Sequence, residues 1–133
     1  MSSRAPLIWE LPADVPAQAG VTTVQAAILG EVTDSGTVTE VAIVPAAAVT
    51  ANTNNFRTFT VFNRGTAGTG TVPVAALDTS VTGFTDNDER LMTLATAANL
   101  LLVADSVLEV VETVASSGVA HGGYRITAKV SRT

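Results

Sequence analysis

Residues 56–64 read Phe-Arg-Thr-Phe-Thr-Val-Phe-Asn-Arg, and they form the clearest strand pattern in the sequence. Phe59 and Val61 share one side of an extended chain, and the side chains that alternate with them share the other. Such alternation is typical of a strand with one face in the core. The pattern returns in residues 124–131, where Tyr, Ile, Ala and Val oppose Arg, Thr and Lys. Both stretches predict antiparallel β-structure.

Further strand-like stretches lie on both sides of residues 56–64, separated by turn-forming residues. In residues 90–95 we expect Leu91 and either Met92 or Leu94 to be buried. Residues 97–103 could instead form a helical turn. These patterns predict an all-β fold, an antiparallel β-sandwich or jelly-roll-like barrel of about eight strands. The other expected strands are residues 22–32, 37–44 (with one register adjustment), 71–77, 81–84 (a brief pairing) and 108–114.

The first twenty residues differ from the rest, because three prolines hold the chain extended while large apolar side chains recur between them. We therefore divide the chain into an extended, proline-rich N-terminal arm, residues 1–20, and a β-sandwich domain, residues 21–133. Two interpretations of the arm are open: it covers the open edge of its own sheet, or it docks on a neighbouring subunit. The side chains assigned to such a contact are Leu7, Ile8, Trp9 and Leu11.

The composition limits the partners of the chain. Only 14% of its 133 residues are charged, against a usual value of about 25%. A surface with few charges can be buried against another protein at little cost in desolvation. The net charge of −5 argues against nucleic acid, since phosphate contacts need clustered Lys and Arg. No apolar run approaches the length of a membrane span or a secretory leader, so we expect a soluble protein made in a cytoplasm.

Few residues suit catalysis or metal binding. The chain has no cysteine and one histidine, which excludes thiol nucleophiles, cysteine zinc sites and two-histidine metal motifs within one chain. Residues 65–70, Gly-Thr-Ala-Gly-Thr-Gly, have the glycine spacing of a phosphate loop. Thr71 stands where that loop needs lysine, however, and strands flank it on both sides. We therefore predict a hairpin connection there.

Two further candidates also lack the context that their chemistry needs. Residues 86–89, Asp-Asn-Asp-Glu, offer oxygen ligands for calcium, but Leu91 stands where a calcium loop needs glycine. We expect a solvated turn there and no metal site. His121 lies before the last strand, and no Gly-x-Ser-x-Gly elbow accompanies it, so we expect a surface histidine. The sequence predicts neither an enzyme nor a cofactor.

From about residue 44 onward, the chain resembles the small β-rich decoration (cement) proteins of tailed-bacteriophage capsids. The resemblance rests on Val-Pro-Ala-Ala-Ala-Val-Thr at 44–50, on residues 56–65 and the glycine–threonine loop that follows, and on Asn-Leu-Leu-Leu-Val-Ala-Asp-Ser-Val-Leu-Glu-Val at 99–110. Members of the family often carry a Gly-Asp pair in this last segment, and here Ala104 replaces the glycine.

This resemblance implies a sandwich that binds the outside of an assembled capsid and stabilises it against internal pressure. It also implies a homo-trimer, the major capsid protein as partner, an N-terminal arm that contacts it, and a place on the virion exterior. The alternative is a carbohydrate- or receptor-binding β-module on a phage head fibre or tail. A tail-tube or head–tail connector protein is a related structural competitor, and a small enzyme is a third class.

Overall fold

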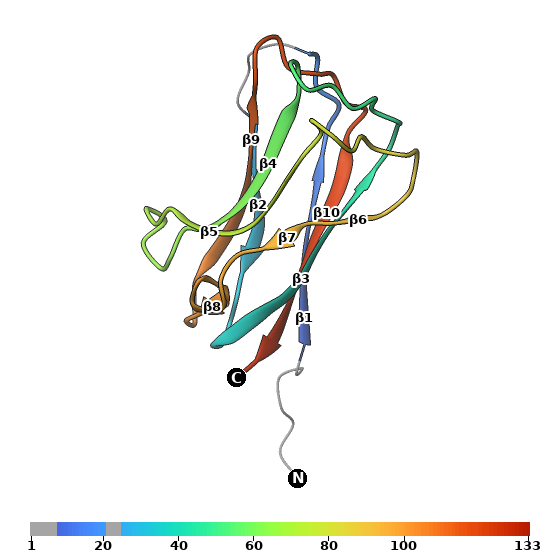
Figure 1. Cartoon of the computed structure of the whole chain (residues 1–133). Helices are drawn as coiled ribbons and strands as arrows, with labels where there is room; N and C mark the ends of the chain where they lie inside the picture. Colours follow the sequence, from blue (N-terminus) through green and yellow to red (C-terminus); the bar gives the residue numbers. More distant parts are fainter. Residues whose placement is uncertain (1–7, 21–24) are drawn as a thin grey trace.

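The computed structural model, which describes residues 8–20 and 25–133, is an antiparallel β-sandwich, and this confirms the predicted fold class (Figure 1). In the first sheet the strand order is β1-β10-β3-β6, and the short β8 also pairs with β3. Its strands are β1 (Ile8–Val15), β10 (Tyr124–Arg132), β3 (Gly36–Pro45), β6 (Arg90–Leu91) and β8 (Leu101–Leu102).

The second sheet faces the first, with strand order β2-β9-β4-β5-β7. A single turn of 3₁₀-helix, η1 (Ala97–Leu100), precedes β8, so residues 97–103 contain both the expected helical turn and a short strand. Residues 81–84 pair only through an isolated bridge between Val49 and Phe84. The strands of the second sheet are β2 (Gln25–Glu31), β9 (Val107–Val114), β4 (Arg57–Asn63), β5 (Val72–Asp78) and β7 (Thr93–Leu94).

The core lies between the two sheets and follows the alternation read from the sequence. Phe59 and Val61 of β4 are fully buried, whereas the side chains between them are only partly covered. On β10, the even-numbered residues from Tyr124 to Val130 are buried in the same way. The ring of Phe59 meets that of Tyr124 edge-on, with 5.2 Å between their centroids. The two inner faces therefore interdigitate in one apolar core.

Residues 90–94 close one side of the sandwich by passing from one sheet to the other. β6 pairs with β3, whereas β7 pairs with β5 (Figure 1). Met92, between the two short strands, is buried as expected, but Leu91 is 60% exposed, so its predicted burial was wrong. Leu91 pairs with Ala42, whose neighbours Val41 and Ile43 point into the core. Leu91 therefore lies on the outer face.

On the other side, β1 and β2 lie side by side as the edge strands of the two sheets. β1 pairs with β10 along its whole length, and Trp9 and Leu11 pack against the core. Residues 8–15 thus cover the open edge of their own sheet, the first of the two interpretations of the arm, and they belong to the sandwich. Leu7, also assigned to the contact, lies outside the described residues. Among those that are described, no helix is long and apolar enough to span a membrane.

Candidate functional site

A cluster of buried polar side chains lies where β4, β9 and the start of β10 approach one another inside the sandwich. Its centre is the carboxylate of Glu112, which is 1% exposed. Nε2 of His121 lies 2.8 Å from Oε1 of this carboxylate, and Nη1 of Arg57 lies 3.4 Å from the same oxygen. The hydroxyl of Tyr124 donates to Oε2 at 2.7 Å. Donors from three directions therefore hold one buried negative charge.

Arg57 links this cluster to two loops: the chain after β1, and the connection from β9 to β10. Its Nε donates to the carbonyl oxygen of Val119 at 3.1 Å, and its Nη2 donates to that of Ala19 at 3.0 Å. A bridge between Gln18 and His121 joins the same two segments. Arg57 thereby fixes the chain after β1 and the connection from β9 to β10 onto the second sheet.

The hydrogen bonds of His121 define its tautomer. The backbone N–H of Gly123 donates to Nδ1 at 3.0 Å, so Nδ1 carries no proton and Nε2 donates to Glu112. Burial, followed by the charge of Glu112, raises the pKa of Tyr124 far above its ordinary value, which keeps its hydroxyl available as a donor. The expectation of a surface histidine was therefore wrong: His121 is buried because Glu112 and Gly123 satisfy both ring nitrogens.

The sequence held a signal for this cluster that the prediction missed. Arg57 has the same odd parity as Phe59 and Val61, and Glu112 the same even parity as the buried Leu108. Strand alternation alone would have placed both charges inside the sandwich. A pair of opposite charges at inward positions of two strands is the pattern that could have revealed it.

The outer face of the second sheet includes a surface with few charges. One row of paired residues crosses all five strands without a charge: Ala26, Val111, Thr60, Ala76 and Thr93. The next row begins with Ile28, which is 65% exposed, and continues through Glu109 to Phe62. We call this surface the Ile28 face and define it by Ala26, Ile28, Thr60, Phe62, Ala76 and Val111.

The two charges beside Phe62, those of Arg64 and Glu109, neutralise each other, whereas Glu31 at the end of β2 is exposed on the same side of the sheet. Nη2 of Arg64 lies 2.7 Å from Oε1 of Glu109, and both side chains are largely covered. The guanidinium also lies over the ring of Phe62, 4.8 Å from its centroid, and it donates to the carbonyl oxygen of Gly70. Cation and carboxylate are therefore already paired and held in place before any partner arrives.

The outer face of the first sheet differs, because its charges stand in solvent. Asp14 and Arg125 form a two-point ion pair with N–O distances of 2.9 and 3.0 Å, although both side chains are more than half exposed. Hydrogen bonds from Arg125 lower the pKa of Asp14. Lys129 and Glu40 form a second exposed pair. This face is suited to contact with water.

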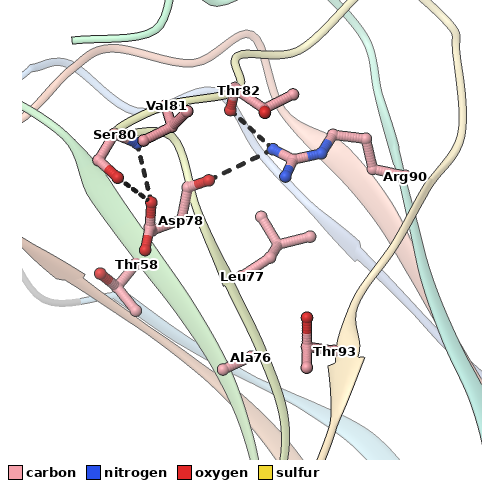
Figure 2. A pocket seen from close by; sticks show the side chains of 9 residues that line it. All are labelled: Thr58, Ala76, Leu77, Asp78, Ser80, Val81, Thr82, Arg90 and Thr93. Atoms are coloured by element: carbon pink, nitrogen blue, oxygen red, sulfur yellow. Dashed lines mark hydrogen bonds between the residues drawn. The ribbon is translucent and has the colours of Figure 1, made fainter. Parts of the chain in front are cut away.

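A shallow polar hollow of about 370 Å³ lies beside the Ile28 face, at the β5–β7 end of the second sheet (Figure 2). Arg90, at the start of β6, reaches over it, and Asp78, at the end of β5, lies on the opposite side. Hydrogen bonds from Ser80 lower the pKa of Asp78 and turn its carboxylate away from Arg90. The lining residues are Thr58, Ala76, Leu77, Asp78, Ser80, Val81, Thr82, Arg90 and Thr93.

The other residues that the sequence analysis considered as candidate sites lie in turns, in the core or on the surface of the sandwich. Residues 65–70 connect β4 to β5, which pair antiparallel, and this confirms the predicted hairpin. Residues 86–89 are exposed, and the N–H of Asn87 donates to the carbonyl oxygen of Pro45. Within residues 8–20 and 25–133, no group of three metal-ligating side chains comes together. Of the assigned arm residues, Trp9 and Leu11 face the core, whereas Ile8 is 59% exposed.

Comparison with known proteins gives one distant structural match. No family model matches the chain, and a search of curated proteins found no match. A solved structure titled "Structure of infectious bursal disease virus Gx strain" is similar with a TM-score of 0.43 and 13% sequence identity. The match covers 94% of this chain and 32% of that chain, so the present chain spans about a third of the length of the protein that it matches.

Proposed function

We propose that this chain is a virion structural protein that binds the outer surface of an assembled capsid and stabilises it. In this role it is a decoration protein, its partner is the major capsid protein, and it binds as a homo-trimer on the virion exterior. Neither catalysis nor a cofactor has a part in it. The observation that carries the proposal is the Ile28 face, and the resemblance of residues 44–133 to phage decoration proteins supports it.

The Ile28 face suits a permanent contact with protein for a physical reason. Burying its apolar side chains contributes about 25 cal/mol per Å² of apolar area. Little desolvation opposes this at the Ile28 face itself, because the ion pair of Arg64 with Glu109 is already formed and largely covered, and the exposed Glu31 lies at the end of β2. The first sheet would instead expose its ion pairs to desolvation if it faced a partner. We therefore assign the capsid contact to the second sheet.

Weak contacts are sufficient for this function because a capsid repeats them. When one copy touches several capsid subunits, each later contact forms at the high effective concentration set by the first. The shell then opens only if many contacts break together. Of the residues assigned to the arm, Trp9 and Leu11 stabilise the sandwich itself. Ile8 is exposed on the outer face of the first sheet, on the same side of β1 as Asp14, and so lies away from this contact.

Substitution of Ile28 tests the proposal. Ile28→Lys places a charge on the Ile28 face, at its β2 edge, and we expect binding to capsid shells to weaken by at least about tenfold, because that charge must be desolvated. Purified protein is mixed with shells assembled from the major capsid protein of the same genome, and the bound fraction is measured by co-sedimentation. The thermal midpoint should not change, because Ile28 is 65% exposed.

Val103→Lys is the matched control, because Val103 is 62% exposed and lies outside the second sheet. We expect normal binding from this variant. Equal losses from both substitutions would contradict the assignment of the Ile28 face. Absence of binding by the unaltered protein would contradict the decoration function, and specific retention on a glycan array in its place would favour the carbohydrate-binding alternative.

A further inference from the structure

Arg90 is held rigidly at the rim of the hollow beside the Ile28 face. Its Nη1 donates to the carbonyl oxygens of Thr82 at 2.9 Å and Asp78 at 3.3 Å, and it lies 3.5 Å from that of Gly83. The guanidinium also lies over the buried ring of Phe84, with Cζ 5.7 Å from the ring centroid. These contacts fix both the position and the plane of the guanidinium (Figure 2).

The opposite edge of this guanidinium has no partner within the described residues. All the hydrogen bonds of Arg90 there use Nη1, which leaves the N–H groups of Nε and Nη2 without an acceptor. These two nitrogens form the side of the guanidinium that matches the two oxygens of a carboxylate. In Figure 2 the guanidinium lies above Leu77, and the hydroxyl of Thr93 lies farther along the hollow.

The charge of Arg90 is also incompletely balanced. Burial lowers the pKa of Arg90, and the nearby charge of Asp78 opposes this effect only in part. The Asp78 carboxylate accepts hydrogen bonds from the backbone and side chain of Ser80 and forms no ion pair with Arg90. A second carboxylate would therefore find a fixed cation whose neutralisation is favourable.

We propose that the hollow is a docking site for a carboxylate side chain of a partner protein, an Asp or Glu, which the Nε–Nη2 edge of Arg90 binds through two parallel hydrogen bonds. The hydroxyl groups of Thr58 and Thr93 line the path of approach. Because Ala76 belongs both to the hollow and to the Ile28 face, a partner seated on that face places its side chains here. The inference deepens the proposed function and rests on it for the identity of the partner.

The lining favours a protein carboxylate over an acidic sugar. Sugar sites in proteins commonly offer an exposed aromatic ring for stacking, and the nearest ring here, that of Phe84, is buried and covered by Arg90. The hollow is also shallow, which suits one side chain projecting from a flat protein surface. The molecule carries a net charge of −5 and repels carboxylates in general. Binding at this site therefore depends on the local N–H donors of Arg90.

The test is an NMR titration of the arginine Nε–H resonances with N-acetyl-aspartate N-methylamide. We expect a saturable shift of the Arg90 resonance in the millimolar range and no comparable shift for Arg125, which already has the carboxylate of Asp14. The asparagine analogue of the probe should leave Arg90 unchanged. Absence of a saturable Arg90 shift, or equal shifts of all arginines, would overturn the proposal.

Two variants and one competing probe complete the experiment. Arg90→Lys keeps the charge but loses the two-nitrogen edge, and Thr93→Phe keeps Arg90 and fills the hollow. Each should weaken probe binding by at least about tenfold, as followed on the backbone amide resonances of Ala76 and Thr82, because the lysine variant has no Arg90 Nε–H. Normal binding by a folded Thr93→Phe protein would overturn the location. Tighter binding of glucuronate than of the aspartate probe would overturn the protein partner in favour of a sugar.

The same variants separate this inference from the decoration function. If the probe binds to Arg90 but the protein does not bind capsid shells, the carboxylate site stands and the decoration function falls. If shells bind normally and the probe does not, the carboxylate site falls alone.

Discussion

Glu112 illustrates, at the scale of single residues, how one buried carboxylate can organise the end of a sandwich. It accepts hydrogen bonds from His121 and Tyr124 and forms an ion pair with Arg57. Through Arg57 the same cluster holds the backbone near residues 19 and 119. A buried charge is tolerated only when its partners are complete, so these residues depend on one another.

We expect Glu112→Gln to lower the free energy of unfolding by about 3–5 kcal/mol, because it removes the carboxylate that balances the buried charge of Arg57. Urea denaturation followed by circular dichroism measures the loss. Glu40→Gln is the control: it alters the exposed pair with Lys129 and should cost about 1 kcal/mol or less. Similar small losses from both substitutions would show that the cluster does not stabilise the fold.

Because of Tyr124, the free energy of unfolding should decrease at alkaline pH. Its pKa in the folded protein is raised above the ordinary value of 10.0, so above about pH 10 the unfolded chain releases this proton and the folded chain keeps it. The contribution to stability is complete below pH 10. It falls as the pH rises further, by up to about 1.4 kcal/mol per pH unit.

Urea unfolding at several pH values above 9 checks this expectation, with Tyr124→Phe as the variant that should lose this part of the slope. Because the chain has one tyrosine, the tyrosinate absorbance reports this group alone. It should appear only together with unfolding. Tyrosinate absorbance at ordinary pH in a protein that is still folded would contradict the prediction.

Among the elements, β1 is the edge strand of the first sheet and covers the edge that β10 would otherwise expose. Pro12 lacks an N–H, and an edge strand tolerates this because one side of its backbone needs no partner in the sheet. Trp9 pairs with Val130 and packs against the core, whereas Ile8, one residue earlier, points outward. The strand therefore contributes to the fold through alternate side chains.

We expect Trp9→Ala to lower the free energy of unfolding by about 3 kcal/mol, since it removes a large ring that packs on the core. Ile8→Ala is the matched control from the same strand and should change stability by about 0.5 kcal/mol or less, because Ile8 is 59% exposed. Thermal unfolding of both variants gives the comparison. Equal effects would mean that β1 does not pack as described.

For the molecule as a whole, the important asymmetry is between its two outer faces. Exposed ion pairs occupy the outer face of the first sheet, and the Ile28 face, with the Arg90 hollow at its end, occupies that of the second. The segment 90–94 joins the sheets on one side, and β1 and β2 adjoin on the other. The two sheets are therefore held together on both sides of the sandwich.

Strand alternation, a local property, allowed the strands and the fold class to be predicted from the sequence, since the side chains of an extended chain must alternate between two faces. Even the register adjustment in residues 37–44 is present, at the irregularity opposite Lys129 and Val130. The partner of β1 and the burial of His121 could not be predicted in this way. They depend on contacts between residues far apart in the chain, such as Trp9 with Val130, and only the tertiary structure decides which distant groups supply hydrogen bonds to a buried side chain.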